Sequence, residues 1–216
     1  MASRTEALRH LKRVDPKLYQ ATLTHHASLP ATLSSKRTSS ALLNALISIV
    51  ISQQLGTAAA DAIFRRARKA SGGHFTAELL LKTSRSAFAT AGLSSAKIKT
   101  MRSIARAVRN KSLNLAQLRT LPETEISEQL LAIWGIGPWS VDMFMLFALG
   151  KGDVFSPGDL GLIRAMETLY GISNNAPREI FIARARTWSP HRTYASLLLW
   201  RSRNIVPKTP SKGRHR

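Results

Sequence analysis

The sequence has no cysteine among its 216 residues. This excludes a disulfide scaffold, a thiolate-ligated zinc site, a cysteine nucleophile and a cysteine-ligated iron–sulfur cluster, and it fits a reducing compartment. Long hydrophobic runs are also missing. The two longest, residues 41–51 and 141–150, are interrupted by polar residues and are shorter than the roughly 20 residues that span a bilayer. We therefore expect a soluble protein.

Acidic residues are scarce. Asp and Glu together number 12, against 32 Lys and Arg, so the formal net charge is +20. Because 44% of the residues are hydrophobic, the chain is too apolar for a disordered basic tail and should fold. A folded basic protein favours a polyanionic partner, with nucleic acid first and an anionic membrane surface second. Residues 1–13 are charged throughout, which is unlike a secretory signal, so we expect an intracellular protein.

The hydrophobic pattern predicts a chain that is almost entirely helical. Asp15-Pro16 marks a helix start within residues 8–18, and residues 29–40 have the composition of a linker. No alternation long enough for a strand occurs. The remaining predicted helices cover residues 41–70, 97–108, 126–134, 139–149, 159–170 and 190–203.

The predicted helix over residues 97–108 is amphipathic. Its basic side is a stripe formed by Lys99, Arg102, Arg106 and Arg109. Such a stripe is either an ordinary solvated surface or a surface that faces phosphates. The net charge of the chain favours the second interpretation.

Two glycines flank one apolar residue in Gly135-Ile136-Gly137-Pro138. Proline suits the first turn of a helix, and glycines permit a tight turn, so this segment predicts a hairpin between two helices with Ile136 anchored in the core. The amide groups at the start of the second helix could bind a phosphate. The alternative is an ordinary interhelical turn.

Residues 130–149 resemble the helix-hairpin-helix of the HhH-GPD superfamily of DNA base-excision glycosylases. Residues 150–165 are similar to the loop and catalytic aspartate that complete this motif. Ile49–Leu55 is similar to the loop that these enzymes push into the duplex, and Gly92-Leu93-Ser94 with Lys97 is similar to another family signature. Residues 188–200 resemble the C-terminal helix of the alkylbase branch. Over residues 5–203 the resemblance is closest to the compact 3-methyladenine DNA glycosylase II group.

The resemblance implies an all-α fold with two helical subdomains around a cleft. Residues 1–40 are expected to pack with the C-terminal subdomain. Residues 41–125 would form the helical subdomain with the duplex-wedge loop, and residues 126–205 the helix-hairpin-helix and catalytic subdomain. Residues 206–216 would be a basic disordered tail.

The family's catalytic carboxylate matches Asp159. A carboxylate suits the reaction because breaking a base–sugar bond builds positive charge on the sugar. Asp159 also fits a helix N-cap, and Asp142 and Asp153 are nearby rivals. Trp139 stands where glycosylases with lyase activity carry a Schiff-base lysine, so the resemblance implies a monofunctional enzyme.

Further roles follow from the resemblance. The base pocket is assigned to Trp139, Trp200, Met143 and Trp134, which fit plain core packing as well. The wedge candidates are Gln53, Gln54 and Leu55, followed by Gly56 where the family often has serine. DNA phosphates are assigned to the backbone amides of Gly135, Gly137 and Ser140 and to Lys97. A monovalent cation on the carbonyls of Leu131, Ile133 and Ile136 is expected, and no organic cofactor.

We therefore expect a monomeric, monofunctional glycosylase that removes 3-methyladenine and 7-methylguanine from double-stranded DNA, associated with DNA in a nucleoid or nucleus. A glycosylase for another lesion, such as hypoxanthine or uracil, is one alternative. A non-catalytic helix-hairpin-helix protein that binds damaged DNA is another, although a carboxylate at position 159 would then only repel phosphate. A membrane-surface protein lacks the expected basic helix with aromatic anchors.

Overall fold

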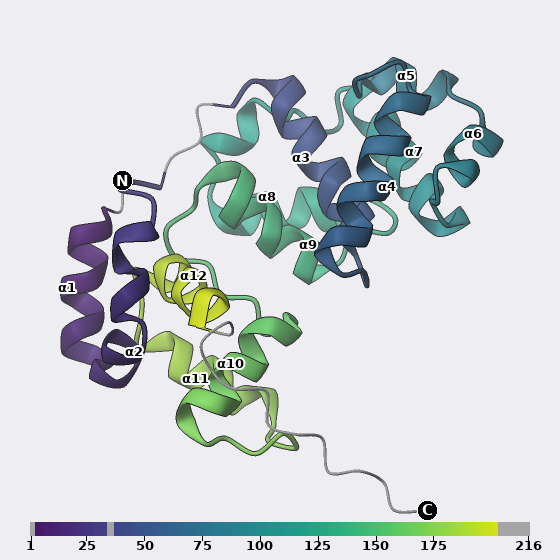
Figure 1. The fold of residues 1–216 in the computed structure, drawn as a ribbon. Helices are drawn as coiled ribbons and strands as arrows, with labels where there is room; N and C mark the ends of the chain where they lie inside the picture. The colour runs from purple at the N-terminus through teal and green to yellow at the C-terminus, as the bar shows by residue number, and fades with distance from the viewer. Residues whose placement is uncertain (1–2, 34–36, 203–216) are drawn as a thin grey trace, which may run out of the picture. The chain divides into compact units, whose positions relative to one another are not determined.

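The computed structural model describes residues 3–33 and 37–202, and helices make up its fold (Figure 1). The described residues contain no strand, only an isolated bridge between Ser3 and Thr32, so the all-α prediction is confirmed. They divide into two compact units. The first joins the residues up to Leu33 with those from Gly152 onward, and the second runs from residue 34 to Lys151. The predicted tail, 206–216, lies outside the described residues.

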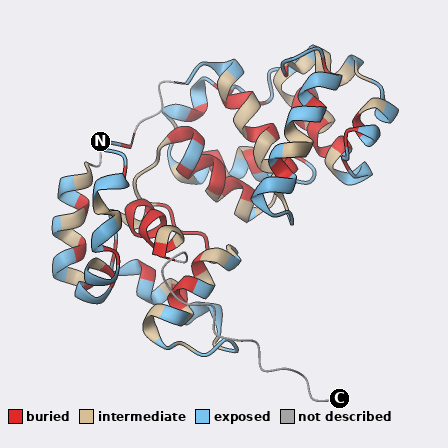
Figure 2. Cartoon of the chain, in the orientation of Figure 1, coloured by how far each residue is buried: buried red, intermediate tan, exposed pale blue. Residues whose placement is uncertain are grey.

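The first unit combines the two ends of the described chain. The helix α12 is almost wholly buried (Figure 2) and packs against α1, α2, η1 and α10. Residues 3–33 therefore pack with the C-terminal part, whereas residues 37–40 of the expected N-terminal segment belong to the second unit. The helices of this unit are α1 (Arg4–Val14), α2 (Pro16–Ala21), η1 (Leu23–Ser28), α10 (Leu160–Tyr170), α11 (Arg178–Arg186) and α12 (Arg192–Ser202).

A buried carboxylate connects these helices. Asp15 is 2% exposed and caps α2 by accepting a hydrogen bond from the Leu18 amide. It also accepts hydrogen bonds from the Tyr170 hydroxyl at 2.7 Å and the Trp188 indole at 2.8 Å. Burial, followed by the hydrogen bond to Asp15, raises the pKa of Tyr170, so this hydroxyl remains a proton donor.

The second unit is built around α3, which packs against α4, α7, α9 and η3. One side of α3 is fully buried, including Leu46, Ile47 and Val50. The helices of this unit are α3 (Ser39–Ser52), α4 (Thr57–Ala70), α5 (Ala77–Lys82), α6 (Arg85–Thr90), α7 (Ser95–Arg109), η2 (Gln117–Arg119), α8 (Glu123–Leu131), α9 (Pro138–Met143) and the π-helical η3 (Phe144–Leu149).

Three sequence-based predictions about helices were wrong in detail. The helix expected over 41–70 is two helices, because Gln54 adopts a left-handed conformation with φ 57° and Gly56 starts α4. The helix expected over 126–134 ends at Leu131, before the hairpin turn. Helix α11 was not predicted; it follows Pro177 and carries Glu179 in its first turn.

The hairpin lies in the second unit, so the unit boundary falls after Lys151 and differs from the boundary drawn at residues 125/126. The reason is that α9 and η3 pack on α3. Searched over its described residues, the chain has no helix long and apolar enough to cross a membrane.

Candidate functional site

The hairpin between α8 and α9 depends on one glycine. Gly135 has φ 85°, and a Cβ atom at this position would collide with the side chain of Thr100 on α7. Gly135 therefore has to be glycine for its conformation and for space. Ile136 is 6% exposed and anchors the turn as predicted. Gly137 is the N-cap of α9, which begins at Pro138.

One predicted phosphate contact of the hairpin does not fit the structure. The Ser140 amide donates to the Gly137 carbonyl at 2.9 Å, and Ser140 is only 2% exposed. Its hydroxyl accepts a hydrogen bond from Gln53. Ser140 lies one turn into α9, so its backbone amide serves the helix, whereas Gly135 and Gly137 lie in the turn itself.

The predicted wedge residues, Gln53, Gln54 and Leu55, lie in the turn between α3 and α4, and the first of them fastens this turn. The Gln53 side-chain amide donates to the Gly135 carbonyl at 3.1 Å and to the Ser140 hydroxyl at 2.9 Å. Its amide is thus directed at the hairpin. Gln54 and Leu55 are exposed, Leu55 at 38%, so they are the two candidates that the structure presents to solvent.

Lys97 has a structural position that the sequence did not predict. Its ammonium donates to the carbonyls of Ile51 at 2.6 Å and Gln53 at 2.9 Å, at the C-terminus of α3. Burial lowers the pKa of Lys97. A cation suits this place because the last carbonyls of a helix lack partners within it. Lys97 therefore supports the wedge loop from inside, through the carbonyls of Ile51 and Gln53.

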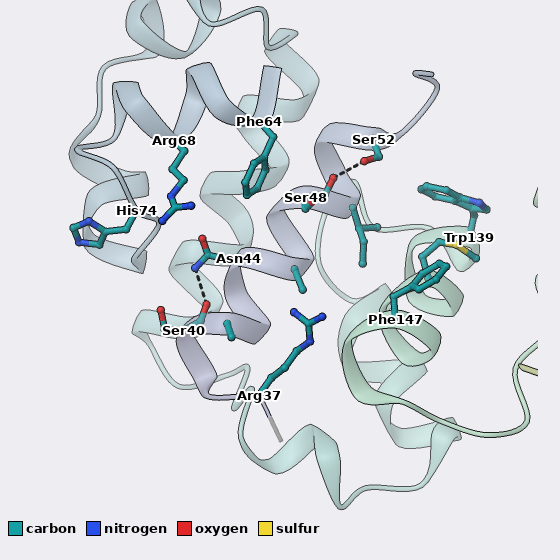
Figure 3. A pocket seen from close by; sticks show the side chains of 14 residues that line it. Arg37, Ser40, Asn44, Ser48, Ser52, Phe64, Arg68, His74, Trp139 and Phe147 are labelled. Carbon is teal, nitrogen blue, oxygen red and sulfur yellow. Dashed lines mark hydrogen bonds between the residues drawn. The ribbon is translucent and has the colours of Figure 1, made fainter. Parts of the chain in front are cut away.

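A hollow of about 700 Å³ opens in the second unit beside α3 (Figure 3). Trp139, Met143 and Phe147 line one side, so the structure brings together two of the predicted pocket residues. Figure 3 shows Phe64 and Arg68 of α4 on the opposite side of α3 from Trp139 and Phe147. The floor and remaining wall are lined by Arg37, Ser40, Ala41, Asn44, Ala45, Ser48, Ile49, Ser52 and His74.

The polar side chains of α3 in this hollow were missed. Asn44 and Ser48 lie one turn apart, and Ser52 follows at the end of the helix. The Asn44 amide nitrogen donates to the Ser40 carbonyl, and the Ser52 hydroxyl donates to the Ser48 carbonyl, so these side chains present oxygen atoms. Their spacing of four residues was the available signal, although the apolar majority of α3 concealed it.

Trp134 is not brought together with Trp139 and Met143. It follows the end of α8 and is 47% exposed, with the Lys99 ammonium 3.8 Å from its ring centroid. Arg106 lines both hollows that Trp134 lines, and Arg102 lines one of them. The turn at Gly135 separates the two tryptophans, so the predicted common pocket does not form.

In the first unit, Asp159 is the N-cap of α10. Its Oδ1 atom accepts a hydrogen bond from the Leu162 amide at 2.9 Å and another from the Trp200 indole at 2.9 Å. Asp159 and Trp200 are both half-buried. Two N–H donors, from the backbone of α10 and from the side chain of α12, hold the carboxylate in one orientation. Asp159 therefore caps α10, as one interpretation of the sequence predicted, and it also binds the side chain of Trp200.

The rival Asp153 is committed to a structural pair. Its carboxylate accepts hydrogen bonds from the Arg192 guanidinium at 2.8 and 3.1 Å and from the Ser189 hydroxyl at 2.7 Å. Burial opposes ionisation, but these donors outweigh it and lower the pKa of Asp153. Asp142, the other rival, lies on α9 in the second unit.

The hairpin carbonyls expected to hold a cation lie within six residues of chain. Ile133 and Ile136 are buried, and the Ile133 carbonyl accepts a hydrogen bond from the Ile136 amide at 3.1 Å. A carbonyl oxygen has a second lone pair, so this bond leaves room for a metal ion. Oxygen ligands from a tight turn suit a hard monovalent cation, and the described residues contain no cluster of acidic or histidine side chains that would compete.

Comparisons with known proteins identify the family to which this chain is related. Residues 47–190 match the model of the HhH-GPD superfamily of base excision DNA repair proteins. DNA-3-methyladenine glycosylase 1 of Schizosaccharomyces pombe is 30% identical over 167 residues, which cover 76% of this chain and 73% of that protein. A putative DNA-3-methyladenine glycosylase of Bacillus subtilis, YfjP, is 33% identical over 97 residues, but the match spans only 34% of its length.

Among solved structures, S. pombe 3-methyladenine DNA glycosylase Mag1, in complex with abasic DNA, superimposes with a TM-score of 0.85 and 28% identity. The superposition covers 94% of this chain and 99% of that one. The family match covers most of the chain and includes the hairpin, the wedge loop and Asp159. The chain therefore belongs to the HhH-GPD superfamily of base excision DNA repair proteins.

Proposed function

We propose that this protein is a monofunctional DNA glycosylase that hydrolyses the N-glycosidic bond of alkylated purines, 3-methyladenine and 7-methylguanine, in double-stranded DNA. The observation that carries the proposal is the carboxylate of Asp159, held by the Leu162 amide and the Trp200 indole. The family membership of the chain and the names of its relatives support the same reaction class.

Asp159 is the catalytic residue of the proposal. Departure of the base leaves the sugar with oxocarbenium character, and a nearby carboxylate stabilises that charge and orients or deprotonates the attacking water. The Trp200 indole fixes the carboxylate before the charge develops, which is the arrangement that makes electrostatic stabilisation effective. An alkylated purine carries a positive charge on its ring and needs little acid assistance to leave.

Water is the nucleophile because the hairpin offers no amine. Trp139 occupies the position of the Schiff-base lysine, and Lys151, the lysine nearest to the hairpin in the sequence, donates to the Leu121 carbonyl at 2.8 Å. The product is therefore an intact strand with an abasic site.

The base contacts are assigned to the hollow beside α3. Trp139 supplies an electron-rich ring that attracts a cationic base, and Met143 adds a polarizable apolar contact. The side-chain oxygen atoms of Asn44 and Ser52, whose donors are used within α3, line the same hollow and favour a base edge that carries hydrogen-bond donors. This polar wall adds selectivity to a pocket that the sequence predicted to be apolar.

DNA binding is assigned to the hairpin and the wedge loop. The amides of Gly135 and Gly137 bind phosphate, and a monovalent cation on the carbonyls of Leu131, Ile133 and Ile136 would add positive charge at the same place. Gln54 and Leu55 enter the duplex and fill the space of the flipped nucleotide.

The test is release of base from methylated duplex DNA under single-turnover conditions. We expect Asp159→Asn to lose about 10²–10⁴-fold in rate. Asp153→Asn makes the same chemical change in the same unit at a carboxylate outside the proposed machinery, so it should retain release at a temperature where it is folded. Equal release by wild type and Asp159→Asn would refute the assignment, and strand cleavage by wild type would refute the monofunctional mechanism.

A second candidate substrate is hypoxanthine. The polar row of α3, with Arg37 and Arg68 in the same hollow, provides hydrogen-bonding groups that a neutral base requires. Duplexes that contain hypoxanthine or uracil are measured in parallel. Faster release of hypoxanthine than of methylated purines would reassign the lesion, whereas binding of all duplexes without release of any base would leave a damage-binding protein.

A further inference from the structure

The basic stripe of α7 gathers around an exposed tryptophan. Lys99, Arg102 and Arg106 line a hollow of about 330 Å³ together with Trp134, and Arg85 adds a fourth cation from the start of α6. The described residues that line this hollow, which we call the Trp134 hollow, include no acidic side chain. Arg109, the last residue of the stripe, does not line it. The proposed reaction uses none of these side chains.

The cationic side chains of the Trp134 hollow are not neutralised by acidic side chains in its lining, and one of their donors lacks an acceptor. The Arg102 guanidinium donates to the Thr83 carbonyl at 2.9 Å, but its buried Nε atom has no acceptor among the described residues. A buried donor without a partner costs free energy, and several cations at close range repel one another. The repulsion among the cations is relieved when an anion enters the hollow.

Trp134 adds the second feature of a nucleic-acid site. Lys99 stacks on the indole ring, which fixes both groups, yet the tryptophan is still 47% exposed. Aromatic rings beside cations are the usual platform for nucleotides, because the ring packs against a sugar or base while the cations bind phosphate.

The Trp134 hollow also adjoins the hairpin. Trp134 directly precedes Gly135, and Gly135 packs against Thr100, the residue after Lys99 on α7. A DNA strand that binds the hairpin amides through one phosphate can therefore reach the Trp134 hollow on α7 with a neighbouring part of its backbone. The hollow offers four cations and one large exposed apolar side chain, Trp134, so it suits the regularly spaced phosphates of DNA better than the apolar core of a protein interface.

We propose that the Trp134 hollow binds the sugar–phosphate backbone of DNA beyond the phosphate held by the hairpin. Arg102 and Arg106 bind the phosphate, and the adjoining deoxyribose packs on Trp134. This inference rests on the proposed binding of duplex DNA and extends its footprint along one strand.

The experiment measures affinity for a duplex with a central abasic-site analogue as a function of salt. Arg106→Gln removes one phosphate contact, so the ratio of affinities at about 50 and 200 mM salt should fall by about 3.5-fold relative to wild type. Arg109→Gln is the matched control, since it removes the same charge from the same helix outside the hollow, and its ratio should remain that of wild type. Trp134→Ala should weaken binding several-fold with an unchanged salt dependence, and Trp134→Phe should restore part of the loss.

Shortening the duplex one nucleotide at a time from each end locates the contact. The effect of Arg106→Gln should disappear when one particular end is shortened and persist when the other is. Equal salt dependences for Arg106→Gln and Arg109→Gln, or no effect of Trp134→Ala in a folded protein, would overturn the inference. Base release by wild type is recorded separately, so failure of the glycosylase proposal is seen there and not in these binding curves.

Discussion

The most informative stability prediction concerns the contact between Gly135 and Thr100. In Gly135→Ala the alanine must adopt φ 85°, a backbone conformation that costs an L-residue about 1–2 kcal/mol. The new Cβ also collides with the side chain of Thr100, which is only 2% exposed. Overpacking of this kind costs about 1–3 kcal/mol. The expected loss in the free energy of unfolding is therefore about 2–5 kcal/mol.

Thr100→Ala separates these two contributions. It removes Oγ1, the atom closest to the new Cβ, together with Cγ2, and leaves only the Cβ of residue 100 at 3.0 Å, while the backbone conformation of residue 135 stays unfavourable. Gly135→Ala should then cost only about 1–2 kcal/mol more than Thr100→Ala alone. The double-mutant cycle should give a coupling energy of about 1–3 kcal/mol.

The assay is urea denaturation followed by helical circular dichroism and by tryptophan fluorescence, whose coincidence checks for a single transition. Gly137→Ala is the control in the same hairpin, because Gly137 has φ −112° and open space where its Cβ would lie. It should lose no more than about 1 kcal/mol, as an N-cap change does. Equal costs for Gly135→Ala with and without Thr100→Ala would refute the steric reasoning.

Four further predictions follow from individual side chains. Lys97→Met should lower stability by about 1–3 kcal/mol, because it leaves carbonyls without donors, and should leave the salt dependence of DNA binding unchanged; a changed salt dependence in a stable variant would restore its phosphate role. Leu55→Ala should slow base release while its free energy of unfolding stays within about 0.5 kcal/mol of wild type. Gln53→Ala should lower both the rate of release and the free energy of unfolding; a loss of stability in Leu55→Ala and not in Gln53→Ala would exchange their roles. Because the folded-state pKa of Asp153 is lowered, its contribution is full at neutral pH and is lost as the pH falls through that pKa, so the stability gap between wild type and Asp153→Asn should close in acid; a constant gap would contradict this. Trp139→Lys should show no strand cleavage and no borohydride-trapped adduct, since Schiff-base chemistry also needs a lysine of lowered pKa.

Much of the fold follows from local patterns in the sequence. The spacing of apolar residues predicted α7, and its buried side includes Ile98, Met101 and Ala105. The glycines and proline of residues 135–138 predicted the hairpin, because backbone conformations are set by the residues that occupy them. Helix α11 escaped prediction, because a nine-residue helix with basic residues on all sides has little periodicity.

The sequence by itself determined the helical class, the position of the hairpin and the N-cap placement of Asp159. Only the tertiary structure decided which side chains meet: Gln53 reaches the hairpin across 82 residues, and Trp200 reaches Asp159 across 41. The tertiary structure also puts Trp139 and Trp134 in different hollows, and Trp134 lies beside the basic stripe of α7. Periodicity fixes the buried face of each helix, but the residue that lies opposite on another helix depends on how the helices pack.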